Sequence, residues 1–285
     1  MDSETSPRLK RLFGCFALLL AVGCSLVFVE IFLRLAWTPP SFRGDRAFGP
    51  HPLFTTGPLP GATGRIVNWE YDHSFSHNRQ GMRGAADVSP VRPDGVTHRV
   101  LFVGDSFTYG LGSANEETFV ERVHQQLDGV EVINAGSNGY GQREQLAVID
   151  SVGAVVKPDM TVLMFFWNDL EDNVRRTKPE FALGDGGKVV RTDPGQKRRD
   201  KIDPLAFREP DLEKSRKKGG LYFPALFTEG LKGLRYRVLG IKRRSIQTEE
   251  EKAEAWEVTE RLLSLVVRRS EEIGTRLVVA SIPDH

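Results

Sequence analysis

Three short turns hold the residues of this 285-residue chain that are best suited to chemistry. The first, Gly104-Asp-Ser-Phe-Thr-Tyr-Gly110, places Ser106 directly after an apolar run. A serine at a strand-to-helix turn exposes its hydroxyl, and nearby backbone N–H groups can stabilise the charge that develops on an attacked carbonyl. The alternative is a tight turn in which Asp105 caps a short helix. The spacing is not Gly-x-Ser-x-Gly, and no Lys follows as in a phosphate loop.

The other two turns carry groups that can donate hydrogen bonds to an oxyanion. Asn134-Ala-Gly-Ser-Asn-Gly-Tyr-Gly141 offers the backbone N–H of Gly136, and Phe165-Phe-Trp-Asn-Asp169 offers the side-chain amide of Asn168. Each sequence alone also suits an ordinary turn at the end of a strand. Together they place a nucleophile, a glycine that permits close approach and an amide donor at intervals of 30 and 32 residues. That combination predicts an acyl-transfer site.

The elements that must position these turns alternate between strands and helices. Apolar runs rich in β-branched residues predict strands at 99–103, 130–133, 160–166 and 276–282, and apolar periodicity predicts helices at 118–127, 143–156 and 249–273. Gly274 stands where the last of these helices should end. Strands and helices that alternate in this way predict a parallel sheet covered on both faces. In such a sheet the three turns would meet at one edge, where ligands bind.

The three turns resemble the first three sequence blocks of the SGNH (GDSL) hydrolase superfamily. The resemblance extends upstream to Asn78-Arg-Gln-Gly-Met-Arg83, which is similar to a segment of membrane-anchored bacterial members. It implies a three-layer α/β/α domain, of SGNH or flavodoxin-like type, at 98–285. In that family Ser106 would be the catalytic nucleophile, and the oxyanion would be held by the N–H of Ser106, the N–H of Gly136 and the side chain of Asn168. A histidine oriented by an aspartate would act as base.

The chain departs from the family pattern at its carboxyl end. The family carries Asp and His in a late block, usually Asp-x-x-His, whereas this sequence ends at Pro283-Asp-His285 shortly after the final predicted strand. Adjacent Asp284 and His285 have the wrong spacing and an early position for that pair. We therefore expect a fragment or an early-terminated product; reading the coding sequence beyond codon 285 for Asp-x-x-His tests this.

The amino-terminal segment predicts a membrane helix. Residues 12–29 are 18 consecutive residues without a charge, the apolar pattern continues to Trp37, and Pro39-Pro40 follows. This length can span a bilayer. An uncleaved signal-anchor, a cleaved signal peptide and a lipoprotein signal ending at Cys24 are the three interpretations. We favour the signal-anchor at 12–37, because the apolar run exceeds a signal-peptide core and no small-residue cleavage site follows. Residues 1–11 would then be cytoplasmic and the large domain exported.

Two further segments differ in composition from the rest. Residues 38–97 contain eight Gly and eight Pro, which predicts an irregular tether and lead-in, with a strand near residues 65–71. Residues 188–244 hold 17 Lys or Arg against 7 Asp or Glu. This basic insertion is either a solvated segment or a contact for anionic lipid headgroups or an acidic glycan. Apolar residues within 221–239 predict one or two docked helices.

Composition limits the class of function. A net charge of +1 gives no domain-wide basic field, so nucleic-acid binding is not expected. Both cysteines, Cys15 and Cys24, lie in the predicted anchor, and no metal or organic cofactor is indicated. Together with the predicted anchor, the resemblance to the SGNH hydrolases implies a membrane-anchored ester hydrolase acting on O-acyl groups, such as acetyl, of a glycan or cell-envelope polymer. The alternatives are an O-acyltransferase on the same fold and a non-catalytic binding domain.

Overall fold

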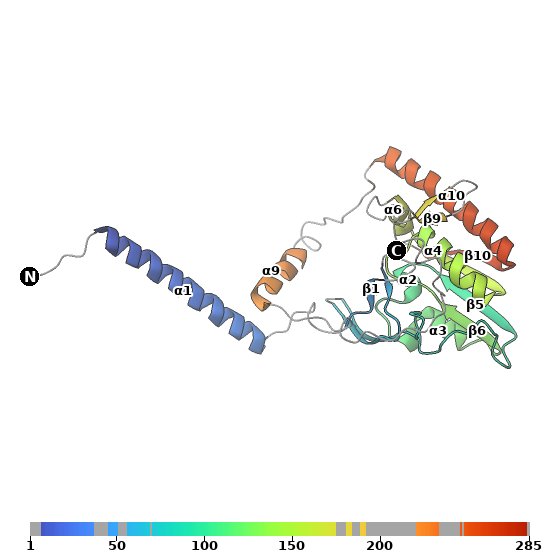
Figure 1. Cartoon of the computed structure of the whole chain (residues 1–285), viewed down its shortest axis with the longest axis horizontal. Coiled ribbons are helices and arrows are strands. Elements are labelled where there is room, and N and C mark those ends of the chain that lie inside the picture. Colours follow the sequence, from blue (N-terminus) through green and yellow to red (C-terminus); the bar gives the residue numbers. More distant parts are fainter. Residues whose placement is uncertain are drawn as a thin grey trace, which may run out of the picture. The chain divides into compact units, whose positions relative to one another are not determined.

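The structure of the chain is a computed structural model that describes residues 7–36, 45–50, 56–68, 70–174, 181–183, 189–191, 221–233, 246 and 248–283. The chain divides into two compact units. One comprises residues 1–43 and 217–242, and the other comprises residues 44–216 and 243–285. Figure 1 shows the described elements along the chain. Asp284 and His285 lie outside the described residues, as do Trp37 and most of the basic insertion.

The described part of the first unit contains two helices, α1 (Pro7–Ala36) and α9 (Tyr222–Gly233). Helix α1 covers nearly all of the predicted anchor, and its apolar side chains are exposed around its circumference. Residues 11–36 are long and apolar enough to cross a membrane, a test that an amino-terminal signal sequence also passes. Helix α9 is the docked helix expected within 221–239, and it lies against α1.

The second unit contains a four-stranded parallel sheet, as the sequence predicted. Its strand order is β10-β7-β5-β6, and all neighbouring pairs are parallel. The strands are β5 (His98–Val103), β6 (Val130–Asn134), β7 (Met160–Phe165) and β10 (Arg276–Ser281). Each agrees with its predicted range to within about one residue at either end. The carboxyl ends of these strands therefore lie at one edge.

Side chains alternate between the two faces of this sheet, and each face has its own apolar core. Leu101, Val103 and Leu163 lie in a core with residues of α4 (Gln142–Val148), α6 (Asn168–Val174) and α10 (Glu249–Ile273). On the opposite face, Phe102 and Val162 pack with Val120 of α3 (Phe119–His124). The unit thus has the helix–sheet–helix layering expected of an α/β domain.

The helices agree with the sequence in position and differ in detail. Helix α10 has the predicted bounds, begins at a Thr248 cap and ends at Gly274 in the left-handed conformation. Helix α3 is shorter than predicted. The predicted helix at 143–156 is divided into α4, a π-helical turn η3 (Ile149–Gly153) and α5 (Ala154–Val156). The short helix α2 (Ser106–Tyr109) is the one whose capping by Asp105 was an alternative for the first turn, whereas η2 (Asn115–Glu117) was not predicted.

Residues 45–97 contain more regular structure than the sequence predicted. Four short strands form two antiparallel hairpins: β1 (Phe48–Pro50) with β2 (Thr56–Pro58), and β3 (Thr63–Val67) with β4 (Asp72–Ser76). The prediction of a single strand near residues 65–71 was wrong, because the chain reverses direction between β3 and β4. The Asn68 side chain accepts hydrogen bonds from the N–H groups of Glu70 and Tyr71, a local turn that competes with an extended strand. A third hairpin joins β8 (Phe181–Leu183) to β9 (Val189–Arg191).

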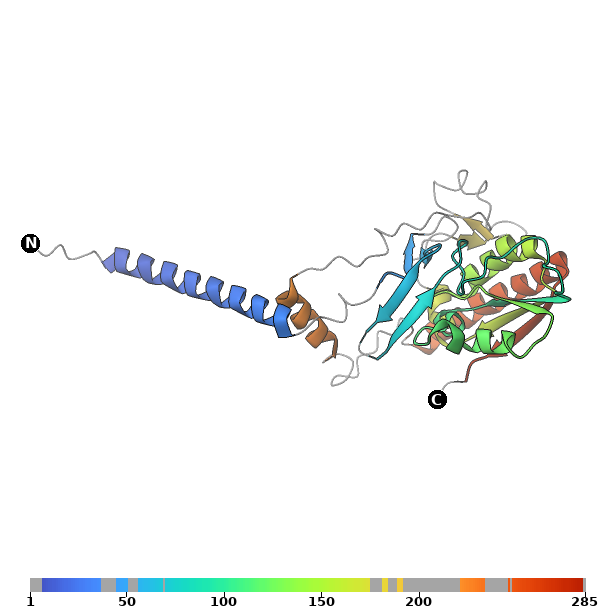
Figure 2. The same ribbon diagram turned by 90° about the horizontal axis from the view of Figure 1, so that it is seen from below.

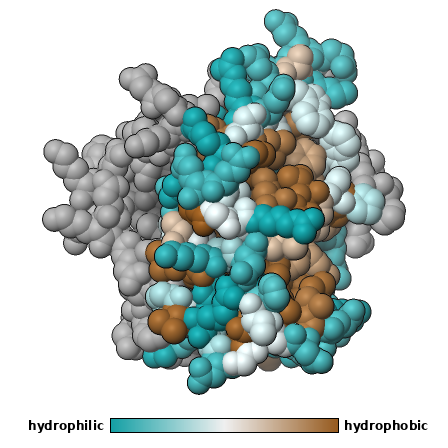
Figure 3. All heavy atoms as spheres, turned by 90° about the vertical axis from the view of Figure 1, so that its right-hand side faces the viewer, coloured by the Kyte–Doolittle hydropathy of each residue, from teal (hydrophilic) through white to brown (hydrophobic). Residues whose placement is uncertain are grey.

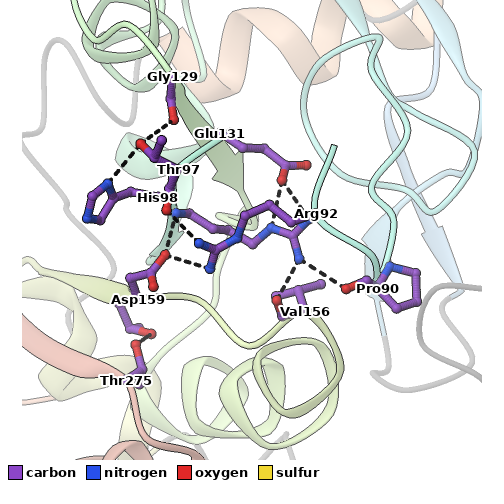
Figure 4. A network of polar contacts seen from close by, with 11 residues as sticks. Pro90, Arg92, Thr97, His98, Gly129, Glu131, Val156, Asp159 and Thr275 are labelled. Carbon is purple, nitrogen blue, oxygen red and sulfur yellow. Dashed lines mark hydrogen bonds and ion pairs between the residues drawn. The ribbon is translucent and has the colours of Figure 1, made fainter. Parts of the chain in front are cut away.

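A buried ion pair ties together the amino-terminal edge of the sheet (Figure 4). Arg99, 1% exposed, donates from Nε to Glu131 at 2.6 Å and from Nη1 to the carbonyl of Val156 at 2.6 Å. Asp159 accepts the N–H of Arg99 at 2.7 Å and pairs with Arg92 at 2.8 Å. These contacts connect β5 with the start of β6 and with the residue that precedes β7.

The two units have different surfaces. On the side of the second unit seen in Figure 3, hydrophobic areas are interspersed with hydrophilic side chains. Single exposed apolar residues such as Val91 and Val279 are ordinary on a water-soluble domain. Helix α1 differs, because its exposed side chains are almost all apolar from Leu12 to Val29.

Loss of the Glu131 carboxylate should destabilise the second unit strongly. Glu131→Ala leaves the Arg99 guanidinium buried without its partner, so the free energy of unfolding should fall by about 3 kcal/mol. Asp72→Ala removes a partner from the exposed Arg65–Asp72 pair and should cost less than about 1 kcal/mol. Denaturant unfolding of the full-length protein in detergent measures both; equal small effects would contradict a structural role for Arg99.

Candidate active site

The three turns singled out in the sequence lie together at the carboxyl edge of the sheet. Helix α2 follows β5 and begins at Ser106, while the second turn follows β6 and the third follows β7. The backbone joins the first two turns, since Ser137 donates its N–H to the carbonyl of Gly104 at 3.1 Å. Ser106 is partly exposed, whereas Asp105 before it is fully buried. The nucleophile predicted from the sequence is therefore partly exposed, although the residue directly before it is buried.

Asp105 links the first turn to the third. One of its carboxylate oxygens accepts the N–H of Phe107 at 2.9 Å, which caps α2, and the other accepts Nδ2 of Asn168 at 3.1 Å. The cap proposed as the alternative role of this turn is thus present together with the exposed serine. Burial raises the pKa of Asp105, and the hydrogen bonds from Phe107 and Asn168 oppose that increase. An amide nitrogen carries two hydrogens, so Asn168 can donate one to Asp105 and one to a ligand.

The second turn packs directly on α2, and only glycine fits there. A Cβ atom on Gly136 would lie 2.5 Å from the backbone nitrogen of Tyr109. The Gly136 N–H donates to Oδ1 of Asn134 at 3.1 Å, and Nδ2 of Asn134 donates to the carbonyl of Thr108 at 2.9 Å. An oxyanion would have to share or take over the Gly136 hydrogen from Asn134. Asn134 thus bridges the second turn and α2, a role that the sequence did not predict.

A network of hydrogen bonds between buried polar side chains supports the third turn on its buried side. Asp169, fully buried, accepts the Phe166 N–H at 3.2 Å and Nε2 of Gln142 at 2.6 Å. Asn173 accepts the N–H of Gln142 at 2.9 Å and donates to Thr259 of α10 at 2.8 Å. Burial, with a contribution from the charge of Asp105, raises the pKa of Asp169 to about 8. The carboxyl group of Asp169 is therefore largely protonated at neutral pH.

The lead-in motif at residues 78–83 contacts this edge as well. Asn78 folds the segment by accepting the N–H groups of Gln80 at 3.1 Å and Met82 at 2.8 Å. Arg83 then donates its N–H to the carbonyl of Asn134 at 3.3 Å, and its guanidinium lies 4.5 Å from the centre of the Tyr109 ring. The motif thus braces both α2 and the end of β6.

The described histidines lie elsewhere. His77 is buried and contacts the Leu59 carbonyl and the Tyr109 hydroxyl, and burial lowers its pKa to about 3. His73 accepts the N–H of Gly112, His98 contacts Thr97, and His124 lies on α3. None of these four is hydrogen-bonded to Ser106. His51 and His285 lie outside the described residues.

Aromatic side chains flank the three turns. The rings of Phe107 and Phe166 are 4.4 Å apart, and Trp167 meets Trp256 of α10 edge to face at 5.7 Å. Phe107 and Trp167 are each 48% exposed although they adjoin Ser106 and Asn168. Flat apolar surface therefore borders the nucleophile. In the part of the chain that the structure describes, there is no group of three or more His, Cys, Asp or Glu residues that could hold a metal ion.

Comparisons with known proteins find similar solved structures and nothing else. No protein-family model matches the chain, and no curated protein matches it. Axe2, an acetylxylan esterase from Geobacillus stearothermophilus, matches at 15% identity and a TM-score of 0.26, over 65% of this chain and 76% of that chain. AlinE4, described as an SGNH-hydrolase family esterase, matches at 17% identity and a TM-score of 0.25, over 60% of this chain and 97% of that chain.

TM-scores of 0.25 and 0.26 are too low for these matches to carry an argument about the family or activity of this chain. The conclusions about function therefore rest on the residues of this chain and their contacts.

The raised pKa of Asp169 should make the stability of the second unit fall as pH rises. Because the folded state binds a proton that the unfolded state releases near pH 4, stability is full at low pH and is lost between about pH 4 and pH 8. The maximal slope is about 1.4 kcal/mol per pH unit. Asp169→Asn, which keeps the acceptor oxygen, should flatten this dependence in denaturant unfolding of the full-length protein at pH 5, 6 and 7.

The control is Asp150→Asn, which alters an exposed carboxylate paired with Arg269. That variant should keep the slope of the unaltered protein. A slope that Asp169→Asn leaves unchanged would show that Asp169 is ionised when folded.

Proposed function

We propose that the second unit is a serine ester hydrolase of the SGNH type in which Ser106 attacks the carbonyl of an acyl ester. The observation that carries the proposal is the hydrogen bond from Asn168 to Asp105. It brings an amide donor from the third turn next to the residue that precedes the nucleophile, although the two are 63 positions apart in sequence. A turn that served only as a helix cap would need Asp105 alone.

In the proposed reaction, Ser106 Oγ bonds to the carbonyl carbon as a base takes its proton. The oxyanion that forms would accept hydrogen bonds from the N–H groups of Ser106 and Gly136 and from Nδ2 of Asn168. Collapse of the tetrahedral intermediate releases the alcohol, which takes a proton, and water then releases the acid from the acyl-enzyme. Asp105 and Asp169 act as positioning residues, because they hold Asn168 and its turn through hydrogen bonds.

We further propose that the substrate is an O-acyl ester, such as an acetyl ester, of a glycan or cell-envelope polymer. The exposed rings of Phe107, Trp167 and Trp256 support this, because flat aromatic faces pack well against the apolar face of a sugar ring. Passing the acyl group to a sugar hydroxyl instead of water would make the same site an acyltransferase. Product analysis with and without a deacetylated glycan acceptor separates the two reactions.

The protein would act at a membrane, as a single-pass protein with its large domain on the extracytoplasmic side. The exposed apolar surface of α1 supports the membrane anchor. The basic residues Arg8, Lys10 and Arg11 before the helix are matched by Arg34, Arg43 and Arg46 after it, so the shortness of the amino-terminal tail, residues 1–11, is what favours a cytoplasmic amino terminus. No cofactor takes part in this proposal.

A non-catalytic binding domain is the second candidate. It is favoured by one observation, namely that none of the described histidines at positions 73, 77, 98 and 124 contacts Ser106. A domain without a base would keep the donors and the aromatic surface and bind an acylated glycan without cleaving it.

Replacement of the nucleophile distinguishes the two candidates. Full-length protein should hydrolyse p-nitrophenyl acetate, and Ser106→Ala should lower kcat by more than about 1,000-fold, since the covalent intermediate cannot form. Ser264→Ala, which alters an exposed serine of α10, should have no effect. Activity that persists in Ser106→Ala would exclude the hydrolase, whereas an inactive unaltered protein that binds the acylated glycan would support the binding domain.

Removal of the side-chain donor tests the oxyanion site separately. Asn168→Ala should lower kcat by about 100-fold to 1,000-fold with a smaller change in KM, because the donor matters most in the transition state. Asn115→Ala removes an amide of η2 that donates a hydrogen bond to the carbonyl of Ser76 on β4, and provides the control for loss of a structural amide. Equal kcat values for the two variants would argue against a role of Asn168 in the reaction.

A further inference from the structure

Helix α9 has no capping residue of its own. The residues before it are Gly219, Gly220 and Leu221, none of which has a side-chain oxygen. The first N–H groups of a helix need acceptors. Here they donate to the carboxylate of Glu30 on α1, from Tyr222 at 2.9 Å and from Phe223 at 2.9 Å. A residue 192 positions earlier in the chain therefore caps α9.

Two further contacts fix this junction. Arg34 pairs with Glu30 at 2.8 Å and lies 4.8 Å from the centre of the Tyr222 ring. Leu33 of α1 and Ala225 of α9 are the buried apolar residues among the described side chains of the two helices. The two helices thus meet through an ionic cap and a small apolar contact. Figures 1 and 2 both show α9 beside the carboxyl-terminal end of α1 and at an angle to it.

The depth in the membrane at which α1 and α9 meet follows from the length of the uncharged segment of α1. Residues 12–29 are 18 residues without a charge, which span about 27 Å as a helix. That length is close to the hydrocarbon thickness of a bilayer, about 30 Å. Glu30 is the next residue, so α9 docks where the hydrocarbon ends and the headgroup region begins.

The side of α9 that faces away from α1 is apolar and exposed. Phe223, Phe227 and Leu231 are spaced four residues apart, which places them on one side of the helix. They are 42%, 64% and 48% exposed. Ala225, which is buried, lies on the opposite side. In a bilayer the surroundings of α1 are lipid, so this apolar stripe would face lipid.

We propose that α9 is an interfacial helix that lies in the headgroup region of the membrane containing α1, with Phe223, Phe227 and Leu231 inserted among the lipids and with Glu30 fixing its depth. An exposed stripe of two aromatic residues and a leucine on a 12-residue helix is what such a helix requires. The surrounding segment, residues 188–244, has an excess of ten positive charges, the sign that anionic headgroups attract.

Site-directed spin labelling of the full-length protein in phosphatidylcholine–phosphatidylglycerol vesicles tests the proposal. Cys15 and Cys24 are the only cysteines, so Cys15→Ala with Cys24→Ala gives a background for single labels. A nitroxide at Phe227→Cys should collide more with oxygen than with a water-soluble nickel chelate. A nitroxide at Thr228→Cys, about 100° around the same helix, should collide more with the nickel chelate than with oxygen.

Three outcomes would overturn the proposal. Position 227 would be as accessible to the nickel chelate as position 228 if α9 lay in water. Alternatively, dipolar broadening between labels at 227 on different molecules would show that the stripe meets a second copy of the chain. Recovery of a membrane-free protein that begins after α1 would also exclude it, because Glu30 would then be absent.

The role of Glu30 is tested by a pair of variants in the 227-labelled protein. Glu30→Ala removes both acceptor oxygens and should make the label mobile and accessible to the nickel chelate. Glu30→Gln keeps one acceptor oxygen and should retain most of the lipid exposure. An unchanged spectrum in Glu30→Ala would exclude Glu30 as the residue that fixes the depth of α9.

Discussion

Parallel pairing of β5 with both of its neighbours determines where every candidate functional group lies. The register places Phe102 beside Asn134 of β6 and Val103 beside Leu163 of β7, so the three strands end at nearly the same level. The three turns that follow these strands therefore lie close enough together to form hydrogen bonds with one another. Asp105 reaches Asn168, and Gly136 meets α2 at a distance that excludes any side chain. Antiparallel pairing of either neighbour would move one turn to the far edge.

Buried ionisable side chains have different surroundings at the two edges of the sheet. At the amino-terminal edge, Arg99 keeps its charge because Glu131 and a backbone carbonyl surround it. At the carboxyl edge, burial and the nearby charge of Asp105 raise the pKa of Asp169 to about 8, so its carboxyl group is largely neutral near pH 7. The first arrangement favours rigidity. The second keeps one carboxyl group uncharged beside the turn that carries Asn168, which suits a site where negative charge must develop on a substrate.

The sequence predicted those features that depend on local pattern. Strand positions, the bounds of α10 and the three turns follow from apolar periodicity and from glycine, and each agrees with the structure. Contacts between distant residues did not follow. The hydrogen bonds of Asn134, Gln142 and Asp169 depend on which turns become neighbours, and a single sequence gives no sign of that choice. The β3–β4 hairpin was missed for a local reason, because Asn68 forms the turn in the middle of an otherwise strand-like run.

The cap on α9 has a consequence for the order in which the protein can be assembled. Ribosomes make Glu30 long before Tyr222, with 192 positions between them. Until the later segment arrives, Arg34, one turn further along α1, is the neighbour that can balance the Glu30 carboxylate. Helix α9, which has no cap of its own, can complete its first turn only after it reaches α1. Docking of α9 therefore exchanges water for two backbone N–H groups at a single carboxylate that was made much earlier.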